Sequence, residues 1–232
     1  MLEECDVRNK VMILLMASTG MRMGALHSLR MEDLQQIPDN FGIYQVQVYA
    51  RTRDKYLTFC TLECAKAIDE YLSYRKRFGE KIQDKSPLIR EQFNVDDKVR
   101  IHYPRFVSEK GIESTIHNIL KKAGVRKPGV IHMSHGFRKF FMTVCEQSGM
   151  KSINVKMLLG HDIGVSGHYY RPAESDILND YMTYAAEALM IDPTQRLQKE
   201  LEQQDLKHSI EWQRLKKELT EIRGILDPTM RT

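Results

Sequence analysis

Long apolar runs are missing from this chain. The apolar stretch 11–16 (VMILLM) stops at 17–20 (ASTG), well short of the roughly 20 residues that span a membrane. Ahead of it stand Glu3, Glu4 and Asp6, where a secretory signal would be basic, and no convincing cleavage site follows. The sequence therefore predicts neither a signal peptide nor a membrane as a partner.

Cysteines in a metal-binding or redox spacing are missing as well. Cys5, Cys60, Cys64 and Cys145 match neither a zinc ribbon nor a CxxC pair. Cys60 and Cys64 could meet on one helical turn, but no further motif indicates a metal or disulfide role. The spacing favours reduced thiols that fill the core of a cytoplasmic protein.

A strong excess of charge is absent overall, since the net charge is only +4. Its distribution is more informative, because residues 98–139 carry ten Lys or Arg and only two acids, a local excess of +8. Such a region would attract a polyanion in a salt-dependent way, although a solvated basic face is the alternative. The residues expected to contact DNA are Lys98, Arg100, Arg105, Lys121, Lys122, Arg126, Lys127 and Lys139.

Helical periodicity dominates a chain of 232 residues, which is long enough for one substantial core and an appendage. Segment 5–30 predicts two helices joined by a turn at Gly20, and further helices are expected over 63–78, 109–123, 134–146, 155–159 and 174–190. Segment 41–59 instead predicts a β-hairpin with a charged tip at 51–55. Segment 84–104 is expected to be irregular.

A change in composition at Asp192-Pro193 predicts a main domain over 1–192 and a helical tail over 193–232. Apolar residues in the tail recur at steps of three and four, as in a heptad seam: Trp212, Leu215, Leu219, Ile222 and Leu226. The seam covers only about two heptads, which does not support a long coiled coil. Packing on its own domain and packing on another protomer both remain open.

Two arginines, two histidines and a tyrosine stand in four short motifs: Arg22 in 18–22 (STGMR), His135 and Arg138 in 135–138 (HGFR), His161 in 158–161 (LLGH) and Tyr170 in 168–172 (HYYRP). The arginine fork suits phosphate oxygens, and His135 and Arg138 would share one helix face. Tyrosine, with an ordinary pKa of about 10, needs positive neighbours to act as a nucleophile. Each motif is weak alone, but their order and spacing indicate metal-free attack on a phosphodiester.

These motifs resemble the catalytic domain of the tyrosine recombinases, the phage integrase family. That family carries Thr-Gly-x-Arg, a hairpin lysine, His-x-x-Arg, Leu-Gly-His and a tyrosine nine residues further on. The matching positions here are Arg22, His135, Arg138, His161 and Tyr170. The resemblance covers roughly 6–184, and the ending Tyr-Tyr-Arg-Pro is similar to archaeal members.

The resemblance implies a fold that is mainly α with a small antiparallel β-sheet (α+β), with the catalytic domain over 1–192. It implies duplex DNA as the partner, a tetramer assembled on two DNA sites, and no metal or other cofactor. Arg22 and Arg138 would bind the phosphate, His135 and His161 would donate hydrogen bonds or move protons, and Tyr170 would attack. The product would be a 3′-phosphotyrosyl link, and the freed 5′-hydroxyl would attack a partner strand.

The chain departs from the family pattern at three places. Ala25 stands where an acid is common. A gapless reading of the hairpin puts Arg51 at the lysine position, whereas Lys55 is the only lysine at the tip. We choose Lys55 as general acid and keep Arg51 as the alternative, because arginine is a poor proton donor. Tyr169 adjoins Tyr170, and the spacing favours Tyr170.

The sequence leaves other functions open. The family's N-terminal DNA-clamping domain has no room before Arg22, so a catalytic fragment or a minimal member is expected. A type IB topoisomerase-like enzyme would use the same chemistry to relax DNA. A DNA-binding module without chemistry could rest on the basic stretch 98–139, and an assembly unit could work through the tail.

Overall fold

The computed structural model describes residues 5–37, 42–124, 133–164, 169–192, 201, 204–205 and 207–219. The chain divides into two compact units, Met1–Ile191 and Asp192–Thr232. In the described ranges, no helix has both the length and the apolar character needed to cross a membrane.

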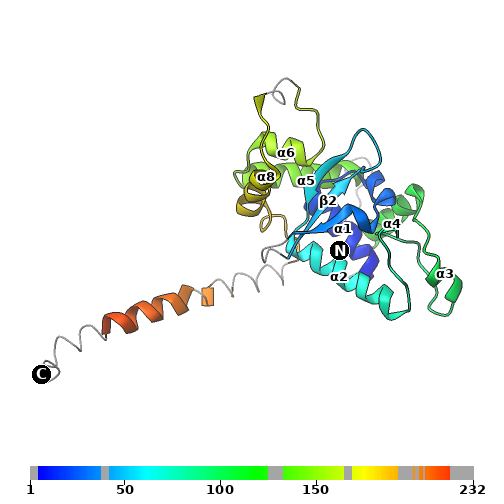
Figure 1. Cartoon of the computed structure of the whole chain (residues 1–232), viewed down its shortest axis with the longest axis horizontal. Coiled ribbons are helices and arrows are strands. Elements are labelled where there is room, and N and C mark those ends of the chain that lie inside the picture. The colour runs from blue at the N-terminus through cyan, green and yellow to red at the C-terminus, as the bar shows by residue number, and fades with distance from the viewer. Residues whose placement is uncertain are drawn as a thin grey trace, which may run out of the picture. The chain divides into compact units, whose positions relative to one another are not determined.

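Helices dominate the first unit (Figure 1). Among the described residues, its α-helices are α1 (Val7–Thr19), α2 (Leu62–Arg77), α3 (Lys98–His102), α4 (Glu109–Lys122), α5 (Met133–Gln147), α6 (Ser152–Leu158) and α8 (Glu174–Asp180). Its other elements are the 3-10 helices η2 (Met23–Ser28) and η3 (Met31–Asp33), the π-helix η4 (Tyr181–Ala185), and the strands β1 (Leu34–Gln36), β2 (Tyr44–Val48) and β3 (Tyr56–Phe59). The predicted fold class, mainly α with a small antiparallel sheet, is confirmed.

The strands of the described residues form one antiparallel sheet in the order β1-β2-β3. Strands β2 and β3 make the hairpin predicted over 41–59, with Val48 paired to Tyr56 next to the charged tip. Strand β1 pairs with β2 and was not predicted. It is too short, and with two glutamines too polar, to show an alternating apolar pattern.

Helix α1 is the centre of the first unit, because residues 11–17 are almost wholly buried on every side. The Asp6 side chain caps its start by accepting from the Asn9 backbone N–H at 2.7 Å. Gly20 ends it in the left-handed conformation, with φ 62°. The apolar run that is too short for a membrane therefore forms the buried core helix.

Two buried clusters meet beside α1. One gathers α1, α2, α4 and the sheet, and the other gathers α5, α6, α8 and η4 against Ile43 and Phe59. Figure 1 shows α5, α6 and α8 grouped on the opposite side of α1 from α3. The end of α1 lies at the junction of these clusters, where Gly20 contacts Phe141 and Leu159.

Three expected elements differ in the structure. The helix after Gly20 is the 3-10 helix η2, and the helix expected over 174–190 is α8 followed by the π-helix η4. Segment 84–104, expected to be irregular, contains the short helix α3. Elements of five to seven residues are too short to show a clear hydrophobic periodicity in the sequence. Tertiary packing therefore decides which kind of helix they form.

In the second unit, 207–219 is helical. Three residues of the predicted heptad seam lie in this helix, namely Trp212, Leu215 and Leu219. Ile222 and Leu226 lie outside the described residues. The choice between packing in cis and packing on another protomer stays a prediction.

Candidate active site

The C-terminal end of α1 is fixed by side chains from three other elements. Consecutive carbonyls there accept hydrogen bonds: Ser18 from Tyr181 at 3.0 Å, Thr19 from Thr58 at 3.3 Å and Gly20 from Arg138 at 2.8 Å. A helix end otherwise leaves such carbonyls without partners. The turn that carries Arg22 is therefore held against η4, β3 and α5.

Gly20 is required for this close approach. A Cβ at this position would lie 2.6 Å from Leu159 Cδ2 and 2.8 Å from Phe141 Cδ1. Its positive φ of 62° also favours glycine. The Thr-Gly-x-Arg motif thus packs directly on the Leu-Gly-His motif, which brings Arg22 towards His161.

Arg138 joins the same two motifs through its guanidinium. Nη1 donates to the Gly20 carbonyl at 2.8 Å, and Nη2 donates to the Leu159 carbonyl at 2.9 Å. Nη2 also lies 2.9 Å from His161 Nε2. These contacts leave part of the guanidinium available to an incoming anion.

His161 is an acceptor in this arrangement, because arginine can only donate. We therefore assign the neutral tautomer with the proton on Nδ1. Partial burial, together with the positive charges of Arg138, Arg22 and Lys156, lowers the pKa of His161 below its ordinary value. The imidazole is thus kept neutral beside the two arginines.

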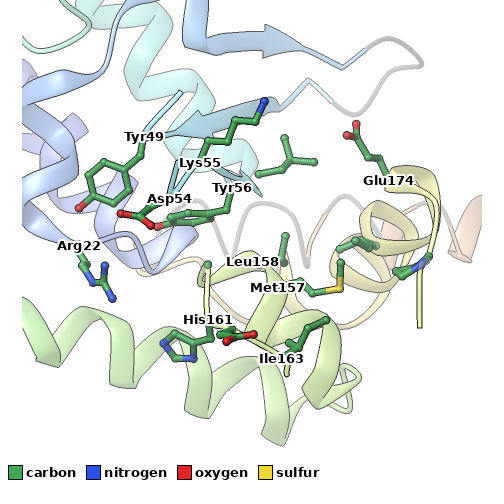
Figure 2. Close-up of a pocket in the computed structure, with 15 residues that line it drawn as sticks. Arg22, Tyr49, Asp54, Lys55, Tyr56, Met157, Leu158, His161, Ile163 and Glu174 are labelled. Atoms are coloured by element: carbon green, nitrogen blue, oxygen red, sulfur yellow. The ribbon is translucent and has the colours of Figure 1, made fainter. Parts of the chain in front are cut away.

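A cavity of about 650 Å³ opens beside this cluster. Arg22 borders it from the turn after α1, Lys55 and Tyr56 from the hairpin, and His161 from the end of α6. Figure 2 shows these residues around the cavity, with the Lys55 ammonium pointing away from Arg22 and His161. We call this space the Arg22 cavity.

Arg51, the alternative to Lys55, is engaged elsewhere. Its guanidinium contacts the Asp33 carboxylate at 2.6 and 2.9 Å and donates to the Ser28 carbonyl at 2.7 Å. The hydrogen bond to Asp33 raises the pKa of Arg51 further. Arg51 borders a separate cavity with Glu32 and Asp33, so this geometry favours Lys55 for the hairpin role.

The two candidate tyrosines do not line the Arg22 cavity. The hydroxyl of Tyr170 donates to Asn154 Oδ1 at 3.0 Å, and its ring borders a neighbouring cavity of about 520 Å³. Tyr169 is 88 % exposed. Pro172 borders both cavities, so the two cavities are neighbours. Tyr170 lines the second cavity and does not line the Arg22 cavity.

The remaining predicted residues that the structure describes do not line the Arg22 cavity, and neither does Arg138, which contacts His161 instead. His135 is exposed on α5, one helical turn before Arg138. The basic residues placed on the surface are Lys98, Arg100, Arg105, Lys121, Lys122 and Lys139. Arg126 and Lys127 lie outside the described residues.

Tyr56 was not among the predicted site residues, although it lines the Arg22 cavity. Its position directly after Lys55 at the start of β3 is the signal that could have identified it. An aromatic residue in a strand is usually read as sheet packing, and the sequence gives no sign that the ring also faces a cavity.

A metal site is not formed by the residues that the structure describes, since no group of three or more His, Cys, Asp or Glu could hold an ion there. All four cysteines fall within these ranges, and none is in a disulfide. The Arg22 cavity is lined by Arg22, Lys55 and His161, which suit an anion, and also by the carboxylates of Asp54, Asp162 and Glu174.

Known proteins match both the sequence and the fold. "Tyrosine recombinase XerC" of Lactobacillus leichmannii is 26 % identical over 156 residues, covering 67 % of this chain and 47 % of the relative. The chain therefore spans about half the length of that relative.

Two solved complexes of the XerH site-specific recombinase share the fold. The pre-cleavage complex with difH is 18 % identical with a TM-score of 0.52, covering 77 % of this chain and 48 % of that chain. The post-cleavage complex with palindromic difH is 17 % identical with a TM-score of 0.51, covering 78 % and 45 %. These relatives do not bear on the resemblance to archaeal members, which stays a prediction. The model of the phage integrase family matches residues 1–175, most of the sequence, and the chain belongs to this family.

Proposed function

We propose that this chain is a site-specific DNA recombinase that cuts and rejoins duplex DNA through a 3′-phosphotyrosyl intermediate. The observation that carries the proposal is the convergence of three side chains that are far apart in sequence. Arg22 and His161 line one cavity, and Arg138 contacts His161. Membership of the phage integrase family supports the class of chemistry. The enzyme would act in the cytoplasm on duplex DNA.

The proposed roles follow from the chemistry of each side chain. Arg22 and Arg138 would bind the non-bridging oxygens of the scissile phosphate, since a guanidinium stays charged and donates two parallel bonds. Neutral His161 would donate from Nδ1. His135 would hydrogen-bond the phosphate or move a proton. Lys55 would be the general acid, after its ammonium turns towards the cavity.

The reaction would proceed by two transesterifications. The Tyr170 oxygen forms a bond to phosphorus while the bond from phosphorus to the 5′ oxygen breaks, and Lys55 gives that oxygen a proton. The phenol proton passes to His135 or to water. A 5′-hydroxyl of the partner strand then attacks the phosphotyrosine and gives its proton to the neutral Lys55 amine. The bond from phosphorus to the Tyr170 oxygen breaks, and that oxygen regains a proton from His135 or water. One ester replaces another in each step, so no ATP is needed.

Assembly of four protomers on two DNA sites is part of the proposal. The exposed basic residues of α3 and α4 would contact the DNA backbone. The tail that begins after Ile191 would join neighbouring protomers through Trp212, Leu215 and Leu219. Mass measurement of the DNA complex, with and without residues 193–232, tests this assembly.

A pool of nicked duplexes with randomised sequence tests the chemistry, because the nick lets the 5′ fragment diffuse away and traps the adduct. Wild type should form a protein–DNA adduct that resists denaturation, and sequencing the trapped DNA should return one site. Tyr170→Phe should form none, whereas the matched control Tyr169→Phe should keep the activity. Adducts from neither wild type nor Tyr169→Phe would contradict the proposal.

A further inference from the structure

The hydroxyl of Tyr56 is buried without a hydrogen-bond partner among the described residues. The ring borders the Arg22 cavity, and in Figure 2 it extends from the hairpin towards the side on which Arg22 lies. A buried polar group without a partner is unfavourable and rare in folded proteins. The hydroxyl is itself buried, so a ligand in the cavity that reached it would supply its missing partner.

The ring of Tyr56 is fixed in place by its neighbours. A Cβ on Gly160 would lie 2.4 Å from Tyr56 Cδ1, so the backbone of the Leu-Gly-His motif packs against the ring face. Tyr49 contacts the ring edge-on, with centroids 6.3 Å apart. The ring is therefore held in one position against Gly160, so little side-chain freedom is lost when the hydroxyl binds a ligand.

The hydroxyl is also kept as a donor in a positive field. Burial raises the pKa of Tyr56. The nearby Arg138 guanidinium, through its charge and hydrogen-bonding capacity, and the charge of Arg22 only partly oppose that rise. Two nitrogens of the Arg138 guanidinium donate to the carbonyls of Gly20 and Leu159. Arg138 lies near enough to the phenol to lower its pKa, but the hydroxyl has no hydrogen bond of acceptable geometry among the described residues. A neutral phenol near two guanidinium groups can donate to an anion that both arginines attract.

We propose that Tyr56 is a further phosphate-binding residue, whose hydroxyl donates a hydrogen bond to a non-bridging oxygen of the scissile phosphate. This inference rests on the proposed function and extends it to a residue outside the family's motifs. The phenol keeps its proton throughout, and no bond is made or broken at Tyr56. Its contribution is a fixed donor aimed at the oxygen on which negative charge develops.

Tyr71 provides a matched control. Its hydroxyl is also buried without a partner among the described residues, but the residue does not line the Arg22 cavity. Tyr56→Phe and Tyr71→Phe both remove an unsatisfied hydroxyl, so neither should lower the thermal midpoint. With the nicked duplex selected by wild type, Tyr56→Phe should slow adduct formation about 10- to 100-fold, the loss expected for one hydrogen bond to a charged group. Tyr71→Phe should match wild type.

A methylphosphonate at the scissile position tests direct contact. It replaces one non-bridging oxygen by a methyl group, so for one diastereomer Tyr56→Phe should react as fast as wild type. A constant deficit with both diastereomers, or a rate on natural DNA within about twofold of wild type, overturns the inference while the proposed function stands.

Binding of inorganic phosphate tests the role of Tyr56 even if the wild-type protein forms no adduct with DNA. That result would defeat the proposed function but would leave the anion site to be tested by thermal shift, with chloride at equal ionic strength as baseline. Tyr56→Phe should need several-fold more phosphate than wild type for a half-maximal shift. Equal requirements in the two proteins overturn the inference.

Discussion

The hydroxyl of Tyr170 donates a hydrogen bond to Oδ1 of Asn154 at 3.0 Å. Asn154 is 1 % exposed, and its Nδ2 donates to Asp180 Oδ2 at 2.7 Å. The backbone N–H of Lys151 donates to the same carboxylate oxygen at 3.2 Å. The phenol proposed as nucleophile is thus held by buried polar groups of α6 and α8, outside the cavity that Arg22 lines.

Asn154→Ala should release this phenol. The variant should lose about 1–3 kcal/mol of unfolding free energy, because the buried Asp180 carboxylate loses a donor. Adduct formation per molecule bound to DNA should become about 2- to 10-fold faster, since the hydrogen bond no longer has to break before attack. Urea unfolding and single-turnover trapping on the nicked duplex measure the two effects.

A control for general destabilisation is Ile116→Val on α4, which is buried in a cluster that includes neither Asn154 nor Tyr170. It should cost about 0.5–1.5 kcal/mol and leave the trapping rate unchanged. If Asn154→Ala binds DNA normally but forms the adduct more slowly than wild type, then Asn154 positions Tyr170 for attack. That result would contradict the prediction that Asn154 holds the Tyr170 hydroxyl back.

Gly160→Ala and Gly124→Ala separate steric overlap from backbone strain. The two glycines have nearly the same φ, 64° and 67°. A Cβ on Gly160 would lie 2.4 Å from the Tyr56 ring, whereas one on Gly124 meets no described atom within 4 Å. Gly160→Ala should therefore be less stable than Gly124→Ala by about 1–3 kcal/mol in urea unfolding. Equal losses would show that the Tyr56 ring moves freely.

The site motifs could be found from the sequence because each is a short pattern with a local chemical meaning. His135 and Arg138 share a helix in the structure, and the turns at Gly20 and Gly160 have the positive φ that glycine favours. The hairpin also followed from its alternating residues. These features depend on neighbours a few positions apart, which a sequence displays directly.

Contacts between segments far apart in the chain could not be predicted from the sequence. The pairing of Arg51 with Asp33 depends on β1, a strand too short for its pattern to be seen. The bond from Tyr170 to Asn154 joins α6 to a turn whose position no local pattern encodes. Both contacts determine which side chains reach the Arg22 cavity. The order of the motifs could therefore identify the candidate residues, but it could not show that Arg51 and Tyr170 are hydrogen-bonded elsewhere.

Glu80 should make the free energy of unfolding depend on pH in the acidic range. Its carboxylate is buried and pairs with Arg75 and, at 2.5 Å, with Arg90. Burial alone would raise the pKa of Glu80, but the hydrogen bonds and charges of Arg75 and Arg90 outweigh it and hold the pKa below its ordinary value. The folded state thus favours the carboxylate, and this stability is lost as pH falls below about 4.5 and through the lowered pKa.

Glu80→Gln tests this contribution, with Glu32→Gln as the exposed control. At neutral pH, Glu80→Gln should cost about 3–5 kcal/mol, because two buried guanidinium groups lose their counter-charge. The difference from wild type should shrink in acid, where Glu80 of the wild type is also neutral. Glu32→Gln should cost less than about 1 kcal/mol. A difference between Glu80→Gln and wild type that stays constant with pH would contradict the assignment.

His161 should titrate below its ordinary pKa of 6.5, since partial burial and the charges of Arg138 and Arg22 oppose protonation. The unfolded chain then binds more protons than the folded one just below pH 6.5, so this contribution to stability falls as the solution is acidified through that window. His161→Gln should remove this part of the pH dependence. Chemical unfolding at several pH values measures it.

The tautomer assigned to His161 predicts how its pKa responds to charge. Arg138→Gln removes the nearest guanidinium, so the pKa of His161 in an NMR titration should rise. Arg100→Gln removes a positive charge on α3 and should leave that pKa unchanged. A pKa above 6.5 in the wild type would contradict the assignment, because in solutions more acidic than that pKa Nε2 carries a proton and cannot accept from Arg138. The cluster would then need an anion already bound between the two side chains to be stable.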